Sequence, residues 1–114
     1  MYHDDSLLVD ILTAARKVVR VTHGMTQDDF AANDVVQDSV IRQIEIMGEA
    51  ARKISGTFQR EHSSIPWHEL RGMRNRLIHD YKKIDLDEVW KTLQTDIPEL
   101  IRLITPLIPP EDSR

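Results

Sequence analysis

The chain of 114 residues contains no cysteine, which excludes disulfide bridges and thiolate metal sites. Its length fits one domain, expected over residues 1–114, and no apolar run is long enough to span a membrane. The formal net charge of −4, taken alone, argues against a nucleic-acid partner. Because the N-terminus is acidic and polar and does not resemble a secretory signal, the sequence predicts a cytoplasmic protein with no membrane association.

The first half of the chain predicts two helices. Apolar residues recur at helical spacing from Asp5 to Thr22, and Gly24 follows as a stop signal. Thr26 begins an N-cap pattern, with an acidic residue three positions later, so a second and longer helix is expected over Asp28–Ser55. Three small residues would let another helix pack closely against it: Gly48, Ala50 and Ala51.

The second half predicts further helices joined by short loops. Residues 57–65 are expected to form a loop that could contain one helical turn. Pro66 favours the start of a third helix, which is expected to end near Tyr81. Asp85 begins a capping pattern for a fourth helix, and Pro98 should kink or divide that helix. No segment has the alternating pattern of a β-hairpin, so the expected fold class is all-α, an antiparallel bundle of four to five helices.

Positive charge is concentrated in residues 71–83. This segment has five basic side chains against one acidic residue, Asp80, a local net charge of +4 on a remainder of −8. A basic segment on an acidic body can still bind phosphate groups. The segment therefore supplies the candidate RNA-binding residues Arg71, Arg76, Lys82 and Lys83.

Two residues in this segment, Arg74 and His79, have the chemistry needed to cleave RNA. RNA provides its own nucleophile, the 2′-OH, so cleavage needs a base, an acid and positive charge on the phosphorane. A histidine can act as acid or base near neutral pH, an arginine offers several donors to phosphate, and no metal ion or other cofactor is required. On a continuous helix, Arg71, Asn75 and His79 would share one face, with Arg74 about 140° away from His79. Asn75 is the accessory polar candidate, able to orient the histidine or to bind a phosphate oxygen.

A single His79 in each chain is a limitation if the acid and the base must be separate groups. A two-fold homodimer would bring two copies of the segment to one cleft. A composite site at a dimer interface is therefore expected.

The sequence resembles the HepT-like HEPN family. Arg74, His79 and Tyr81 match the R-x4-H-x-Y motif of that family. Lys82 departs from the pattern, because relatives often carry an aromatic residue there. The likeness covers nearly the whole chain, in blocks that occur in the same order: Ile44 and Gly48-Glu49-Ala50, Ile65-Pro66-Trp67, Arg71 to Asn75, His79-Asp80-Tyr81, Val89-Trp90 and Ile97-Pro98.

The resemblance implies a HEPN helical bundle that forms a homodimer and acts as the metal-independent endoribonuclease toxin of a toxin–antitoxin pair, type II or VII-like. By this likeness Arg74 and His79 are catalytic and Asn75 is accessory. It also implies a partner, an MNT-type nucleotidyltransferase antitoxin that can transfer AMP to Tyr81. Anionic AMP groups beside Arg74 and His79 would repel or displace a phosphate substrate.

Other interpretations of the same residues remain open at this point. The chain could be a non-catalytic helical subunit that binds beside a nucleotidyltransferase. From the motif spacing alone, Tyr81 is as well explained by a packing role as by modification with AMP. Arg71 and Arg76 also fit a solvated face, and Asp80 is expected to pair with Arg76 one helical turn away.

Two acidic or histidine-containing patterns are expected to have no catalytic role. Glu45 and Glu49 lie one turn apart but are too few for a carboxylate metal site, so they are expected to be solvated. His68-Glu69 begins like a zinc-protease helix, yet Gly72 stands where the second histidine belongs, so no metal site is expected.

Overall fold

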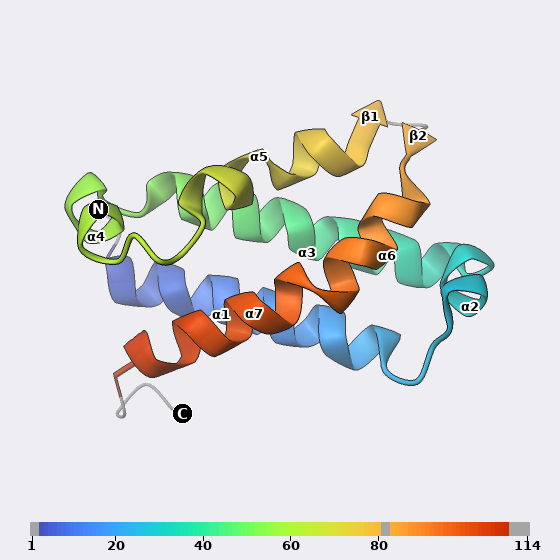
Figure 1. Ribbon diagram of the computed structural model, residues 1–114, viewed down its shortest axis with the longest axis horizontal. Helices are drawn as coiled ribbons and strands as arrows, with labels where there is room; N and C mark the ends of the chain where they lie inside the picture. Colours follow the sequence, from blue (N-terminus) through green and yellow to red (C-terminus); the bar gives the residue numbers. More distant parts are fainter. Residues whose placement is uncertain (1–2, 81–82, 110–114) are drawn as a thin grey trace.

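Helices form most of the computed structural model (Figure 1). The structure describes residues 3–80 and 83–109, with His79 and Asp80 described by their backbone alone. The elements in chain order are α1 (Asp4–Thr22), α2 (Gln27–Ala31), α3 (Asp34–Lys53), α4 (Gly56–Glu61), α5 (Trp67–Leu77), β1 (Ile78–Asp80), β2 (Lys83–Ile84), α6 (Leu86–Gln94), α7 (Asp96–Ile104) and the 3-10 turn η1 (Thr105–Leu107).

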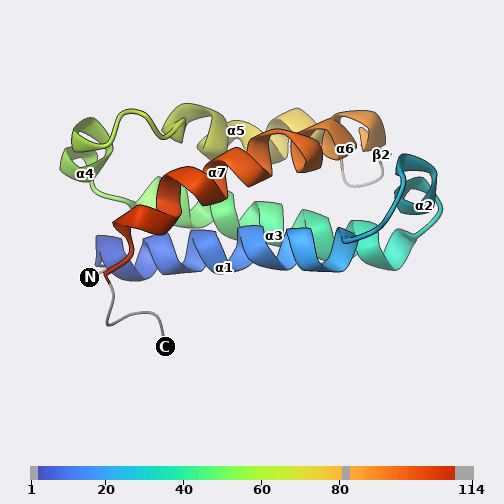
Figure 2. The same ribbon diagram turned by 60° about the horizontal axis from the view of Figure 1, so that its bottom comes forward.

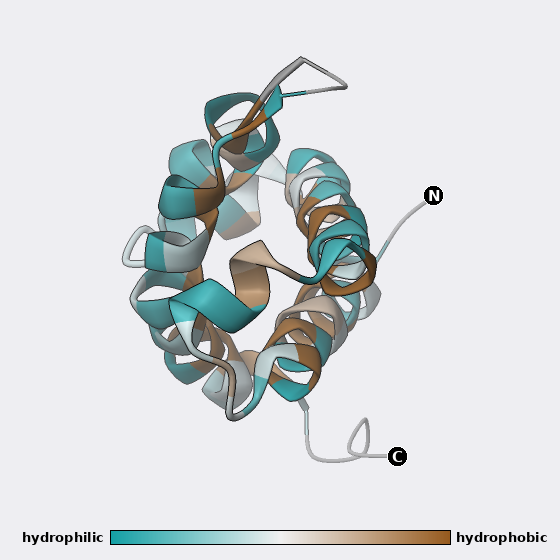
Figure 3. Cartoon of the chain, turned by 90° about the vertical axis from the view of Figure 1, so that its right-hand side faces the viewer, coloured by the Kyte–Doolittle hydropathy of each residue, from teal (hydrophilic) through white to brown (hydrophobic). Residues whose placement is uncertain are grey.

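The long helices pack in two layers around one apolar core. Figures 1 and 2 show α1 alongside α3 in one layer, and α5 with α6 and α7 in the other. The apolar surfaces of the helices face inward and the polar surfaces face solvent (Figure 3). The largest fully buried side chains are Leu8, Ile11, Val18, Phe30, Val40, Ile44, Met47, Leu70, Leu77, Val89, Ile97 and Ile104. The predicted all-α class is thus confirmed.

Several predicted helix boundaries are confirmed by their capping groups. Gly24 follows α1 with φ of +78°, a left-handed conformation that glycine adopts without strain. The Thr26 hydroxyl accepts a hydrogen bond from the Asp29 amide at 3.1 Å, and the Asp29 carboxylate accepts one from the Thr26 amide at 3.0 Å. Pro98 lies in the first turn of α7, where a missing amide hydrogen costs little, and the expected fourth helix is indeed divided, at Thr95.

The single helix expected over Asp28–Ser55 is wrong, because the chain breaks between α2 and α3. Asn33 caps the start of α3 by accepting a hydrogen bond from the Val36 amide at 3.1 Å. Gln37 donates to the carbonyl of Phe30 at 2.8 Å and satisfies the end of α2. The break lets α2 turn inward and bury Phe30 against Trp90, with ring centroids 5.7 Å apart.

The third helix also ends earlier than predicted, and a short hairpin follows it. Helix α5 stops at Leu77, and the Ile78 backbone is extended. Strands β1 and β2 pair antiparallel, with Ile78 opposite Ile84 and Asp80 opposite Lys83. The β-branched Ile78 is buried and suits a strand better than a helix end. The expectation of no hairpin was therefore wrong. The helical turn that residues 57–65 were expected to be able to contain is present as α4.

Helices α3 and α5 pack closely against each other at Gly48. A Cβ atom at this position would lie 3.5 Å from the carbonyl oxygen of Leu70 and 3.8 Å from that of Arg71. A methyl group would just fill the space, whereas a larger side chain would collide with the backbone of α5. The predicted close crossing at this small residue is thus present, and it fixes how α5 sits on α3.

Among the described residues, no helix is long and apolar enough to cross a lipid bilayer. This finding agrees with the sequence, which has no apolar run of that length.

The space at Gly48 predicts opposite effects for two substitutions. Gly48→Ala should leave the free energy of unfolding unchanged or raise it by up to about 1 kcal/mol, because alanine favours a helix. Gly48→Leu should lower it by about 1–3 kcal/mol, because α5 must move away. Urea unfolding followed by far-UV circular dichroism measures both. Wild-type stability for Gly48→Leu would show that α3 and α5 are not this close.

Candidate functional site

Helix α5 carries the predicted site on two different flanks, one against α3 and the other against α7. Arg71 and Arg74 line a cavity on the α3 flank, whereas Arg76 lines a separate cavity on the α7 flank. Asn75 is exposed. The three arginines lie within six residues of sequence, but helical geometry sends them to different neighbours.

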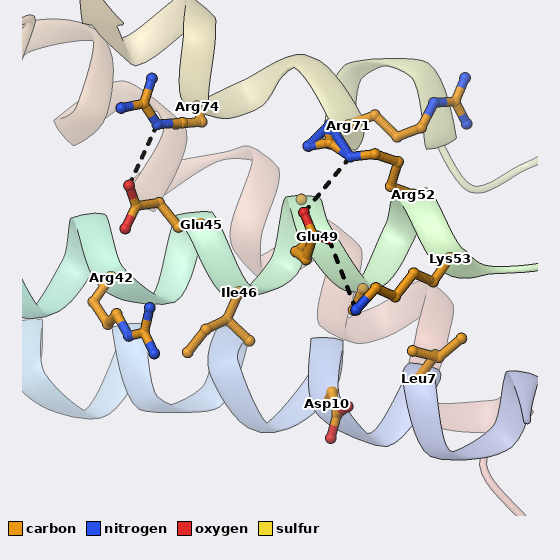
Figure 4. Close-up of a pocket in the computed structure, with 12 residues that line it drawn as sticks. Leu7, Asp10, Arg42, Glu45, Ile46, Glu49, Arg52, Lys53, Arg71 and Arg74 are labelled. Carbon is orange, nitrogen blue, oxygen red and sulfur yellow. Dashed lines mark hydrogen bonds and ion pairs between the residues drawn. The ribbon is translucent and has the colours of Figure 1, made fainter. Parts of the chain in front are cut away.

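Arg74 is held by a partner that the sequence did not identify. Its Nε donates to Glu45 Oε2 on α3 at 3.3 Å, and both side chains are partly exposed, at 47% and 39%. Glu45 was expected to be solvated and is instead ion-paired. Because the contact uses Nε, the two terminal nitrogens of the guanidinium are left to bind another acceptor, and Figure 4 shows them directed away from Glu45.

Arg71 is held by a contact with α4. Its Nη1 donates to Gln59 Oε1 on α4 at 2.6 Å, and Gln59 in turn donates to the carbonyl of Ile54 at 3.0 Å. The partner is a neutral amide, so the full charge of Arg71 remains available to an anion. Arg71 is half-buried, which reduces its freedom to move.

The groove between α1, α3 and α5 has a volume of about 580 Å³ and a mostly charged lining (Figure 4). Eight of its twelve lining residues are charged, five of them basic and three acidic, which gives a net charge of +2. The basic residues are Arg42, Arg52, Lys53, Arg71 and Arg74, and the acidic residues are Asp10, Glu45 and Glu49. Glu49, also expected to be solvated, lies 3.7 Å from both Arg52 and Lys53.

Arg76 lies outside this groove and bonds to side chains of α6 and α7. Its Nη2 donates to the hydroxyl of the buried Thr92 at 3.2 Å and contacts Asp96 at 3.4 Å. Its side chain is 41% exposed, so the expected solvated position is confirmed, and RNA binding by Arg76 stays a prediction. The expected pair with Asp80 stays a prediction, because that side chain is not described.

The α7 flank of α5 is acidic, in contrast to the α3 flank. Its cavity of about 210 Å³ has three acidic lining residues, Glu69, Asp96 and Glu99, against Arg76 alone. Hydrogen bonds from Arg102 lower the pKa of Glu99. Because Arg102 also offsets the charge of Glu99, this side has no excess of positive charge to attract a polyanion.

His79 is not on the helix where the sequence placed it. Its backbone belongs to β1, two residues beyond the end of α5, so the face it was expected to share with Arg71 and Asn75 does not exist. The amide of Ile78 still bonds to the carbonyl of Arg74, which places the start of β1 directly beyond the last turn of α5. The hairpin therefore lies at the Arg74 end of the helix, as Figure 1 shows.

The remaining predicted residues are placed only in part. Lys83 is exposed on β2, next to the same end of α5. Tyr81 and Lys82, and the side chain of His79, lie outside the described residues. Within the part of the chain that the structure describes, no group of three or more His, Asp or Glu side chains could hold a metal ion.

Comparisons with known proteins agree with the motif. The family model described as ribonuclease HepT-like matches residues 11–107. The chain is 41% identical over 93 residues to "Probable ribonuclease HepT" of Thermococcus cleftensis, which covers 82% of this chain and 84% of that protein. It is 38% identical over 95 residues to "Putative RNase MJ1380" of Methanocaldococcus jannaschii, covering 83% and 87%. No solved structure matches the chain.

The contacts of Arg74 and Arg76 predict different effects of their substitution on the free energy of unfolding. Arg76→Ala should lower the free energy of unfolding by about 1–2 kcal/mol, because the buried Thr92 hydroxyl loses its donor. Arg74→Ala should change it by less than about 1 kcal/mol, because its ion pair is exposed to solvent. Urea unfolding of both variants tests this. An equal loss in both would contradict the different roles given to the two side chains.

Proposed function

The chain belongs to the HepT-like ribonuclease family, and from that membership we propose that it is an endoribonuclease that cleaves RNA without a metal ion. The observation that carries the proposal is the position of Arg74. Its guanidinium stands at the edge of a positively charged groove, oriented by Glu45 through Nε, with its terminal nitrogens open to a phosphate. The relatives named as ribonucleases support the same activity.

The proposed reaction uses the nucleophile that RNA carries. The 2′-oxygen attacks the adjacent phosphorus while a base, His79, accepts the 2′-OH proton. The bond from phosphorus to the 5′-oxygen then breaks, and an acid donates a proton to that oxygen. The products are a 2′,3′-cyclic phosphate and a 5′-hydroxyl. Arg74 stabilises the extra negative charge of the phosphorane through its paired donors, and Asn75 is the accessory polar group.

We further propose that the acid and the base are the His79 side chains of two protomers in a two-fold homodimer. One histidine cannot both accept the first proton and donate the second when the two oxygens lie on opposite sides of phosphorus. A two-fold axis beside the hairpin would bring two copies of His79 to one cleft.

The proposed biological setting is a toxin–antitoxin pair. In it, a nucleotidyltransferase antitoxin neutralises the chain by transferring AMP to Tyr81, a residue two positions from His79. The added AMP group would be anionic and bulky and would compete with RNA for cationic side chains. This proposal rests on the family motif, because Tyr81 lies outside the described residues.

The central activity is tested with the purified chain in the presence of EDTA. Arg74→Ala and His79→Ala should each lower the rate of RNA cleavage by about 100-fold or more. Arg102→Ala, an exposed arginine on α7 outside the groove, is the matched control and should cleave at the wild-type rate. Equal rates for wild type and His79→Ala would remove the assignment. Cleavage that needs the nucleotidyltransferase subunit would favour the alternative, a non-catalytic binding subunit.

The regulatory proposal is tested by intact mass spectrometry of the chain after co-expression with an MNT-type nucleotidyltransferase. The mass should rise by one or more AMP groups, and RNA cleavage should fall in parallel. Tyr81→Phe should keep the unmodified mass because it has no hydroxyl to accept AMP. AMP groups that persist on Tyr81→Phe would place the modification elsewhere.

A further inference from the structure

We infer that the RNA strand runs along the groove between α1, α3 and α5, and that Arg42 on α3 binds a phosphate of the strand outside the cleaved linkage. The inference rests on the proposed function, because it takes RNA as the substrate. It adds a binding residue that lies far from the basic segment in sequence and was not among the predicted contacts.

The charges on the two flanks of α5 indicate where the RNA backbone runs. The α3 flank carries a net charge of +2 and the α7 flank a net charge of −2 among their lining residues. Arg74 itself lines the basic flank, so a phosphate bound to Arg74 already lies at that groove. The attraction of its excess positive charge favours a path of the backbone along α3.

Arg42 lines the same groove as Arg71 and Arg74, from the α1 side of α3. Helices α3 and α5 run antiparallel at this point, because Gly48 faces Arg71 and Glu45 faces Arg74. Going from Arg71 to Arg74 on α5 therefore corresponds to going from Gly48 to Glu45 on α3. Arg42 lies three residues further in that direction, about 4.5 Å along the axis of α3, toward the hairpin that carries His79.

The charge of Arg42 is also the least compensated on the α3 side. Arg42 is exposed and has no ion pair within the described residues, whereas Glu49 accompanies Arg52 and Lys53. Figure 4 shows the Arg42 side chain extending from α3 toward α1, beside Ile46, at the α1 side of the groove. A guanidinium that has no acidic partner can bind a phosphate, because no existing ion pair must be broken first.

The composition of the groove favours RNA over a second protein surface. The centre of a protein interface is depleted in charged residues, yet two thirds of the lining here is charged. Proteins that bind single strands use positively charged grooves that follow the backbone. The groove fits a strand bound through its phosphates, with little reading of base identity from these residues.

The inference is tested by RNA affinity in the His79→Ala background, which binds the strand without cutting it. Fluorescence anisotropy with a labelled, unstructured RNA oligonucleotide gives the Kd at several salt concentrations. Adding Arg42→Ala should weaken binding by about tenfold, as expected for a charged hydrogen bond, and reduce the salt slope by about one. Arg42→Lys should keep the salt slope, because it keeps the charge.

Arg16→Ala is the matched control, an exposed arginine on α1 that lines neither the groove nor the cavity on the α7 flank. It makes the same change in net charge and should leave Kd unchanged. An equal effect of Arg16→Ala and Arg42→Ala would overturn the inference, as would an unchanged Kd for Arg42→Ala. Loss of the homodimer in Arg42→Ala, measured by light scattering, with unchanged RNA affinity would make the groove a protein interface. Failure of the proposed function is a different result: the wild-type chain would not cleave RNA.

Discussion

The close packing of α5 on α3 at Gly48 determines the geometry on which the candidate site depends. The backbone of α5 approaches so near that only a hydrogen atom, or at most a methyl group, fits between the helices. One turn along, this approach brings Arg74 within hydrogen-bonding distance of Glu45, and it forms the floor of the basic groove. The buried Leu70 and Met73 hold α5 in this position through the core. The position of Arg74 is therefore a consequence of helix packing.

The three arginines of α5 have different contacts, although they lie within six residues of one another in the sequence. Arg76 bonds to the buried Thr92 and contributes to the fold. Arg74 makes only an exposed ion pair, a kind of contact that adds little to stability. Its pairing with Glu45 is better explained as orientation, because a long flexible side chain held through Nε presents the rest of its planar fork in one direction. Arg71, bonded to a neutral amide, keeps its charge in the groove.

Local signals in the sequence predicted much of the fold, and the failures have physical reasons. The cap at Thr26, the stop at Gly24 and the division near Pro98 are local features, and each is present. The break at Asn33 was missed although asparagine is a good N-cap, because the apolar period continues on both sides. The early end of α5 depends on pairing between Ile78 and Ile84, which a helical pattern cannot reveal. Glu45 and Arg42 could not be found at all, since α3 meets α5 only after folding. The motif indicated the family. The folded structure was needed to show that Arg74 and Arg76 have different partners.

The central claim is that RNA is cut by its own 2′-oxygen, with Arg74 and His79 supplying charge and proton transfer. The most direct measurement is the chemistry of the product ends after cleavage of a labelled RNA in EDTA, resolved by mass spectrometry. The account predicts a 2′,3′-cyclic phosphate on one fragment and a 5′-hydroxyl on the other. A 3′-hydroxyl with a 5′-phosphate would show that water or another external nucleophile attacked the phosphorus, and would contradict it.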